Sequence, residues 1–282
     1  MNPLRQKMID WMILKGYANA TQKSYLYHVS LLARFYHQSP ERLTEDEVQS
    51  YLLHCYKDKH WAFSTCRQFI HAANCFFSHV AKKPLSTTTL PFPATEQKIP
   101  ELLNRTEVRR LIAACTNKKY QPALKLVYAT GVRLSELVKL KVQDLDGESN
   151  TIRIVNAKGH KDRLIEFPEG LKKCLRTYWH YYHPLNWLFY SRHREQPLSR
   201  STIYCAFKKA KKAVGIKKVG GVHQLRHAYA SHELEAGMPL PRLQQQLGHS
   251  DIRTTLRYTR WVKNIKGADS FDLLSTLEQD ES

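Results

Sequence analysis

The chain has 282 residues, and its 44 Lys and Arg residues against 25 Asp and Glu residues give a formal net charge of +19. A surplus of this size favours a polyanionic partner, with nucleic acid first and an anionic membrane surface second. A hydrophobic content of 42% excludes a wholly disordered chain. No apolar run approaches the roughly 18 residues of a membrane span, and residues 1–8 lack the apolar segment of a secretory signal. We therefore expect a cytoplasmic protein without a membrane partner.

Six cysteines are scattered along the chain without a Cys-x-x-Cys pair. This spacing argues against a zinc ribbon, and a long chain without a secretory signal has little need of a disulfide framework. We expect the cysteines to be small core residues. They are Cys55, Cys66, Cys75, Cys115, Cys174 and Cys205.

A proline-rich segment divides the chain. Four prolines fall within the 17 residues from Pro84 to Pro100, with few periodic apolar positions, so this segment cannot sustain a helix. We predict an N-terminal domain over residues 1–88, a linker over 89–100 and a second domain over 101–282.

The N-terminal part has the apolar periodicity of four helices, which make a small bundle. Gly16 marks the end of the first helix, and Thr44 and Glu47 form a capping box that opens the third. The expected helices cover residues 3–15, about 19–37, a segment from Thr44 onward, and about 64–82.

The second part is mixed. Residues 151–155 and 163–167 are rich in β-branched residues or alternate in polarity around a turn, so they predict a β-hairpin. Helices are expected after the capping box Asn104–Glu107, between Pro122 and Gly131, and from Ser199 onward, with breaks at 215–221 and Gly248. The expected fold is therefore mainly α with a small β-sheet.

Two short segments place basic residues at turns. Gly131 allows a sharp bend and presents Arg133 at a helix start, with Glu136 three residues later on the same face. Lys158 lies beside a glycine at the tip of the hairpin, where a lysine can reach a phosphate or a leaving oxygen. Each segment alone is more typical of a solvated surface, the first as an Arg–Glu pair and the second as a basic turn.

The segment His223-Gln-Leu-Arg226-His227 puts a histidine and an arginine on one helix face. Arginine donates a bidentate pair of hydrogen bonds and histidine one more, which makes an anion clamp. A zinc site is the alternative, because His223 and His227 are four residues apart and His232 follows. However, no acidic residue lies between the first two, and Arg226 would repel a bound cation, so we expect no metal here.

Tyr258 is expected two turns into a helix that follows Gly248 and is capped by Ser250 or Asp251. Alone, one of fifteen tyrosines is more typical of a core or rim position. If Tyr258 lies next to the basic residues described above, it can also act in catalysis. Cations around one phosphodiester neutralise the charge of a pentacovalent transition state, and a tyrosine next to them can attack phosphorus. No carboxylate cluster indicates a two-metal mechanism, so we expect metal-free chemistry.

In order along the chain, the motifs are A-T-G-V-R-L-S-E, A-K-G-H-K-D-R, H-Q-L-R-H, and L-G-H-S followed nine residues after its histidine by Tyr258. This ordered set resembles the tyrosine recombinase (phage-integrase-like) family, and in particular its compact Xer-type or transposon-borne members. The resemblance covers nearly the whole chain. It implies a SAM-like helical core-binding domain, an α+β catalytic domain, and a site-specific recombinase or integrase of a mobile element that cleaves and rejoins DNA.

The resemblance also implies residue roles. Tyr258 is the nucleophile that forms a 3′-phosphotyrosyl bond, which conserves the energy of the phosphodiester and needs no cofactor. Lys158 is the general acid, although its neighbour Lys161 is placed to serve instead, and Glu136 supports the site. The residues that stabilise the phosphate are Arg133, His223, Arg226 and His249.

Basic residues outside this set are candidates for DNA contacts. Residues 199–212 form a basic helix, which by charge alone is equally typical of a solvated face. The family places a DNA-contacting helix here, with lysines on phosphates and an arginine toward a base edge. The candidates are Arg200, Lys208, Lys209 and Lys212 in this helix and Lys23, Tyr25 and Arg67 in the N-terminal bundle.

The resemblance implies a dimer on each double-stranded DNA site and a tetramer across two sites, in the cytoplasm and associated with the nucleoid. Phe271, Leu274 and Leu277 repeat at helical spacing and either dock into a neighbouring protomer or pack within their own chain. The sequence leaves open whether a second recombinase or an accessory protein takes part.

Two other functions are compatible with parts of this pattern. A non-catalytic DNA-binding protein could retain the fold, but the complete set of motifs disfavours it. A type IB topoisomerase would use the same tyrosine chemistry to relax supercoils as a monomer. The helical bundle, the linker and the apolar C-terminal segment favour assembly and strand exchange instead.

Overall fold

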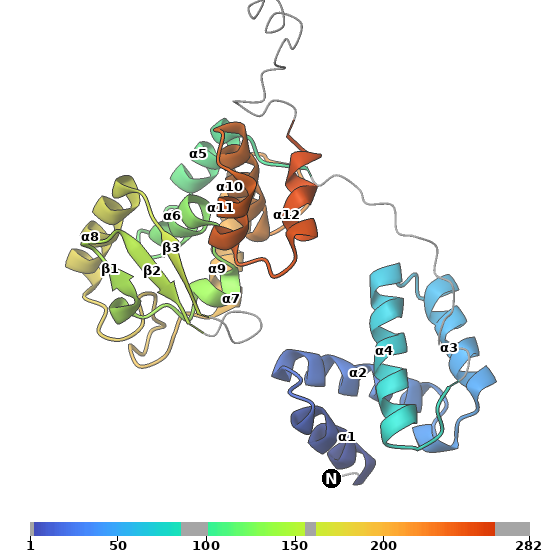
Figure 1. Ribbon diagram of the computed structural model, residues 1–282. Helices are drawn as coiled ribbons and strands as arrows, with labels where there is room; N and C mark the ends of the chain where they lie inside the picture. Colours follow the sequence, from blue (N-terminus) through green and yellow to red (C-terminus); the bar gives the residue numbers. More distant parts are fainter. Residues whose placement is uncertain (1–2, 86–100, 156–161, 263–282) are drawn as a thin grey trace, which may run out of the picture. The chain divides into compact units, whose positions relative to one another are not determined.

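The computed structural model describes residues 3–85, 101–155 and 162–262. The chain forms two compact units, Met1–Lys98 and Ile99–Ser282 (Figure 1). The linker expected at 89–100, Lys158 and Lys161 at the hairpin tip, and the apolar C-terminal segment all lie outside the described residues. No helix of the described part has both the length and the apolar character needed to cross a membrane.

The N-terminal unit is the predicted helical bundle. Met12, Leu32, Phe69 and Phe76 are almost fully buried in its core. The capping box is confirmed: Glu47 N donates to Thr44 Oγ1 at 3.3 Å, and Thr44 N donates to the Glu47 carboxylate at 2.7 Å. The elements are α1 (Pro3–Leu14), α2 (Asn19–Phe35), the short 3₁₀ helix η1 (Pro40–Arg42), α3 (Glu45–Lys57) and α4 (Phe63–His79).

In the second unit, the largely buried helix α10 is surrounded by other helices and a small sheet. Leu225, Ala228 and Ala230 of α10 are fully buried, and α6 packs along it. The helices are α5 (Arg105–Ala113), α6 (Gln121–Thr130), α7 (Leu134–Leu137), the 3₁₀ helix η2 (Val142–Asp144), α8 (Glu169–Tyr182), α9 (Arg200–Ala213), α10 (His223–Glu235), α11 (Leu240–Leu247) and α12 (Ile252–Thr259).

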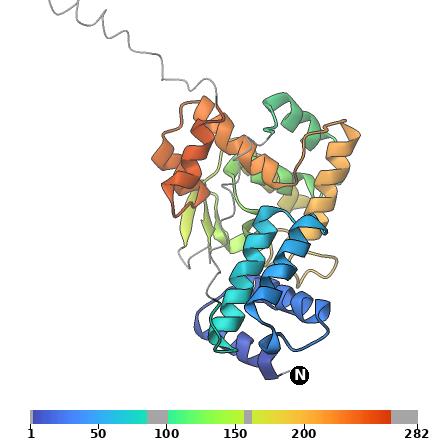
Figure 2. The same ribbon diagram turned by 90° about the vertical axis from the view of Figure 1, so that its right-hand side faces the viewer.

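The sheet is antiparallel, with strand order β1-β2-β3. The strands are β1 (Leu145–Asp146), β2 (Thr151–Ile154) and β3 (Arg163–Glu166). The predicted hairpin is confirmed as β2 and β3, with Ile152 opposite Ile165 and both side chains buried. The pattern did not predict β1, because two residues are too few to show an alternation. β3 packs against α11, and both views show the sheet beside that helix (Figures 1 and 2).

The chain is mainly α with a small β-sheet, as its sequence predicts. The expectation for the cysteines is only partly correct. Four of them are buried, but Cys174 is half-buried and Cys205 is exposed on α9. Cys205 lies outside the buried face of this helix, which is formed by Ile203, Phe207 and Ala210.

Candidate active site

Arg133 stands at the bend between α6 and α7. Gly131 ends α6 in the left-handed region, at φ +66°, and a Cβ there would lie 2.4 Å from the ring of Tyr229, so only glycine fits. Glu136, one turn later, accepts hydrogen bonds from the Arg133 main-chain N at 3.0 Å and from Nη1 at 2.9 Å. Arg133 Nη2 donates to the Gly248 carbonyl at 3.0 Å. The guanidinium is thus fixed between α7 and the end of α11.

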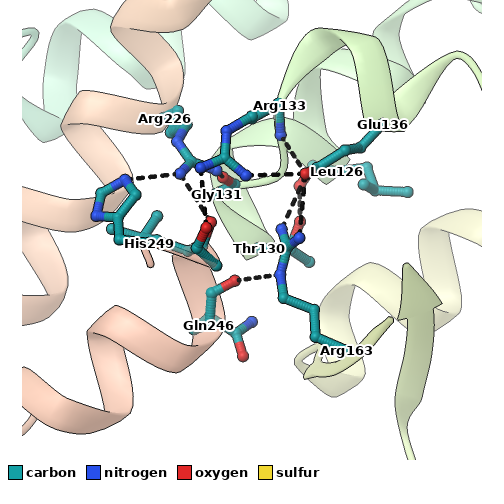
Figure 3. Close-up of polar contacts among 11 residues, drawn as sticks. Leu126, Thr130, Gly131, Arg133, Glu136, Arg163, Arg226, Gln246 and His249 are labelled. Carbon is teal, nitrogen blue, oxygen red and sulfur yellow. Dashed lines mark hydrogen bonds and ion pairs between the residues drawn. The ribbon is translucent and has the colours of Figure 1, made fainter. Parts of the chain in front are cut away.

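Arg163, the first residue of β3, holds Glu136 from the other side. Its Nη1 and Nη2 donate to the two carboxylate oxygens of Glu136 at 3.0 and 2.8 Å (Figure 3). Burial alone would raise the pKa of Glu136, but the hydrogen bonds and charge of Arg163, together with Arg133, bring that pKa down to about 2. Glu136 is therefore ionised and links two arginines. This role of Arg163 is not predicted by the sequence, although the residue ends the A-K-G-H-K-D-R motif.

Arg226 lies deeper in the unit, on α10, with only 2% of its surface exposed. Nη1 forms a short hydrogen bond to the Gly131 carbonyl, and Nη2 donates to the Leu247 carbonyl at 2.8 Å (Figure 3). Among the described residues, no carboxylate lies within ion-pair distance of Arg226. Burial, and then Arg133, lower its pKa to about 10, so the group still carries its charge at neutral pH. A buried cation held by neutral groups rather than by a carboxylate is well placed to receive an anion.

His249 joins this group from the start of the loop after α11. The Arg226 guanidinium can only donate, so His249 Nε2 accepts its hydrogen bond at 2.9 Å. The ring proton therefore lies on Nδ1, which donates to Thr255 Oγ1 at 2.9 Å. Burial and the charges of Arg226 and Arg133 lower the pKa of His249 to about 4, which keeps the ring neutral.

Tyr258 is buried on α12, with 3% of its surface exposed. Asp251, rather than Ser250, caps this helix by accepting from Arg253 N at 3.0 Å. The Tyr258 ring lies parallel to that of His249, with the ring centres 6.4 Å apart. Burial raises the pKa of Tyr258, while Arg226 and Arg133 oppose the increase. The hydroxyl is therefore protonated beside two cations.

His223 occupies the first turn of α10 and is exposed. Its pKa is lowered by partial loss of water and then by the charges of Arg226 and Arg133. Its ring centre lies 5.7 Å from that of His227, the residue after Arg226. The zinc alternative, which the sequence disfavours, required His223, His227 and His232 together. Within the described residues, no group of three or more His, Cys, Asp or Glu side chains is arranged to hold a metal. His232 instead pairs with Tyr128, at 2.9 Å between Nδ1 and the hydroxyl.

The structure thus brings together most residues that the motifs singled out. Arg133 and Arg163 hydrogen-bond to Glu136, and Arg226 hydrogen-bonds to His249 (Figure 3). Arg133 also reaches the carbonyl of Gly248, the residue before His249, and Tyr258 stacks on His249. Two residues of the site were not predicted from the sequence. One is Arg163, and the other is His227, whose Nδ1 hydrogen-bonds with the Tyr258 hydroxyl.

The candidates for DNA contacts lie on the surfaces of the two units. Arg200, Lys208, Lys209 and Lys212 are exposed on α9, Lys23 and Arg67 are exposed in the N-terminal unit, and Tyr25 there is half-buried. Their neighbour Lys211 is different, because its amine is buried and donates to the Gly220 carbonyl at 3.2 Å and Gln224 Oε1 at 2.9 Å.

Both units match known sequence families. Residues 4–87 match the N-terminal SAM-like domain of phage integrases, and residues 101–264 match the Phage integrase family. The chain belongs to the phage integrase family. It is a site-specific tyrosine recombinase, mainly helical, with a SAM-like N-terminal domain followed by the catalytic domain.

Individual relatives agree with this assignment. The recombinase is 34% identical over 277 residues to the putative integrase/recombinase y4qK of Sinorhizobium fredii, covering 97% of this chain and 90% of that one. It is 34% identical over 213 residues to tyrosine recombinase XerD of Staphylococcus aureus, covering 71% and 70%. A structure of a lambda integrase dimer bound to a COC′ core site has the same fold, with a TM-score of 0.74, 19% identity, and coverage of 92% and 94%.

Proposed function

We propose that this recombinase cleaves and rejoins double-stranded DNA at specific sites through a 3′-phosphotyrosyl bond to Tyr258. The observation that carries the proposal is the position of Tyr258, which is buried and stacks on His249, the residue that accepts a hydrogen bond from Arg226. The charges of Arg226 and Arg133 lower the pKa of its hydroxyl. A tyrosine in an apolar core would gain nothing from two nearby arginines. A tyrosine that attacks a phosphodiester needs both.

The charge of the site suits that reaction. Arg133 and Arg163 pair with the single carboxylate of Glu136, and Arg226 is held by neutral groups. These four residues therefore carry a surplus of two positive charges. A phosphodiester carries one negative charge, and its pentacovalent transition state carries two. The surplus therefore fits the transition state better than the ground state, which is the condition for catalysis.

The remaining roles follow from what each side chain can supply. Arg133 and Arg226 donate to the phosphate oxygens, and His223 and His249 contribute further hydrogen bonds once the phosphate replaces their present partners. Glu136 orients Arg133. Lys158 protonates the leaving 5′ oxygen as the general acid. The tyrosyl ester stores the energy of the broken bond, so that religation needs no cofactor and the chemistry needs no metal.

The basic residues outside the site bind the DNA backbone. Arg200, Lys208, Lys209 and Lys212 on α9, with Lys23 and Arg67 in the N-terminal unit, supply exposed cations for this purpose. We propose a dimer on each DNA site, as in the lambda integrase complex, and a tetramer when two sites are joined. Phe271, Leu274 and Leu277 would connect neighbouring protomers.

A suicide substrate tests this function. A nicked duplex made from the DNA that flanks the gene traps the covalent intermediate, because the short cleaved strand diffuses away and cannot rejoin. The wild type should give a slow band on a denaturing gel, and Tyr258→Phe should bind DNA but give none. Tyr128→Phe is the matched control, since it also removes a phenol oxygen paired with a histidine of α10.

Three outcomes would contradict parts of the proposal. A covalent band from Tyr258→Phe would exclude Tyr258 as the nucleophile. Loss of the band in EDTA would contradict the metal-free mechanism. Relaxation of supercoiled plasmid by monomers, without any second site, would indicate a type IB topoisomerase instead of a recombinase.

A further inference from the structure

His227 contacts the oxygen atom that the proposed reaction uses. Its Nδ1 lies 2.9 Å from the Tyr258 hydroxyl. The imidazole ring is half-buried and is fixed between Tyr258 and Trp261, with ring centres 5.7 and 5.9 Å away. The roles described so far make no use of this residue, although it directly follows Arg226 on α10.

The direction of this hydrogen bond follows from the neighbouring groups. Burial, His223 and Arg226 lower the pKa of His227 to about 4, so the ring is neutral at pH 7. The charges of Arg226 and Arg133 lower the pKa of Tyr258, so both cations act on the phenol oxygen. They repel the phenolic proton, which therefore points away from them. His227 Nδ1 is the acceptor in that direction, which puts the ring proton of His227 on Nε2.

We propose that His227 is the general base that takes the proton of Tyr258 during strand cleavage. The inference rests on the proposed function, because it assumes that Tyr258 is the nucleophile. As the Tyr258 oxygen attacks phosphorus, the new O–P bond forms, the P–O5′ bond breaks, and the phenolic proton moves to His227 Nδ1. The leaving 5′ oxygen takes a proton from the general acid. Religation reverses both transfers, so His227 returns its proton to Tyr258.

Bound DNA strengthens this base. The groups that face His227 are His223 and Arg226 on α10, His249 before α12, and Tyr258 and Trp261 in and after α12. Arg226 is the charged member of this set, and it opposes a proton on His227. A phosphodiester bound to Arg226 offsets that charge, and the doubly negative transition state attracts an imidazolium. Without DNA, His227 holds the hydroxyl but does not remove its proton, so the nucleophile stays inactive.

The same helix contains a natural control. His232 Nδ1 lies 2.9 Å from the Tyr128 hydroxyl, the same distance and the same pair of groups, away from Tyr258. Both histidines are on α10 and both pairs are at least partly buried. A change at His232 therefore reports what loss of a His–Tyr hydrogen bond does to the helix, apart from any role in the reaction.

The experiment compares His227→Asn, His227→Leu and His232→Asn in the suicide-substrate assay. The oxygen of an asparagine can accept the Tyr258 hydrogen bond in place of Nδ1, but an amide does not take up a proton. We expect both His227 variants to cleave about 100-fold or more slowly than the wild type, with unchanged DNA affinity. His232→Asn should cleave within a few-fold of the wild type. Thermal unfolding tests whether each variant is folded. If His227→Leu does not fold, the comparison rests on His227→Asn alone.

A second substrate separates the base from the acid. When sulfur replaces the bridging 5′ oxygen, the leaving group needs no proton, so loss of a general acid is rescued. The His227 variants should stay slow on this substrate. Rescue of the His227 variants by the sulfur substrate would overturn the proposal. Cleavage by His227→Asn at the wild-type rate would also overturn it, because His227 would then have only a role in orienting the hydroxyl. Failure of the proposed function is a different result, namely adduct formation by Tyr258→Phe.

Discussion

Arg163 donates two parallel hydrogen bonds to Glu136, and through them the β-hairpin is joined to the helix that presents Arg133. The side chains of Arg163 and Glu136 are only 10% and 8% exposed. Removal of Glu136 would leave the Arg163 charge without a carboxylate partner, and removal of Arg163 would leave Glu136 paired with Arg133 alone. Without Glu136, Arg133 would also lose the carboxylate that fixes its orientation.

Arg163→Met should lower the free energy of unfolding by about 3–5 kcal/mol, the usual effect of breaking a buried ion pair, and should slow strand cleavage. Urea unfolding of the isolated variant measures the first effect. Arg153→Met, on the adjacent strand, is the control, because its pair with Asp162 is largely exposed and should contribute less than about 1 kcal/mol. Equal losses from the two variants would show that the Arg163–Glu136 pair has no special weight.

Glu136 should make the catalytic unit sensitive to acid. Its pKa falls from the ordinary value of 4.5 to about 2 in the folded chain, a difference worth about 3 kcal/mol. Because the folded-state pKa is the lower one, this stabilisation is complete above about pH 4.5 and is lost as the pH falls toward 2. The unfolding free energy of wild type, followed by urea titration across this range, should therefore fall more steeply than that of Glu136→Gln. Parallel curves would contradict the assignment.

Gly248 should resist substitution more strongly than another glycine with a similar backbone. Both Gly248 and Gly215 have positive φ, at +64° and +71°, so alanine costs each about 1–2 kcal/mol of strain. A Cβ at Gly248 would also lie 2.6 Å from Arg163 Cζ, whereas nothing lies within 4 Å at Gly215. Gly248→Ala should thus lose more stability than Gly215→Ala and should also slow cleavage, because Arg163 must move away from Glu136. Calorimetry and the cleavage assay compare the two variants directly.

Adjacent lysines of α9 should respond in opposite ways. Lys212→Met removes an exposed cation, so it should weaken DNA binding and reduce the slope of log affinity against log salt by about 1, without loss of stability. Lys211→Met removes the buried amine that holds Gly220 and Gln224, so it should destabilise the unit. Binding titrations at several salt concentrations, paired with thermal unfolding, test both. A salt slope unchanged by Lys212→Met would remove this residue from the DNA surface.

Local signals in the sequence predicted the parts of the fold that local interactions determine. The capping boxes at Thr44 and Asn104 each involve residues three apart, and both are formed. The hairpin is also local, since β2 and β3 are close in the chain. Helix ends were less accurate, because α4 stops at His79 rather than near residue 82. Tertiary packing and the following turn determine where such a helix ends, and neither leaves a clear pattern in the sequence.

The members of the site that were missed depend on contacts between distant segments. Arg163 is 27 residues from Glu136, and nothing in the alternation of β3 distinguishes its buried arginine from the exposed Arg153 on β2. His227 was considered only as a zinc ligand, because its spacing from His223 was visible and its contact with Tyr258 was not. His227 and Tyr258 are 31 residues apart, and they meet because α10 packs against α12.

The hydrogen-bond partners of Arg226 have a consequence for product release. The carbonyls of Gly131 and Leu247 that hold this arginine belong to the C-terminal ends of α6 and α11, where helix dipoles concentrate partial negative charge. In the proposed reaction, a DNA phosphate would therefore compete with two helix ends for the guanidinium. When the DNA leaves, the arginine would return to them, and its charge would be balanced in both states. Release of rejoined DNA would then be an exchange of partners rather than the exposure of a bare buried cation.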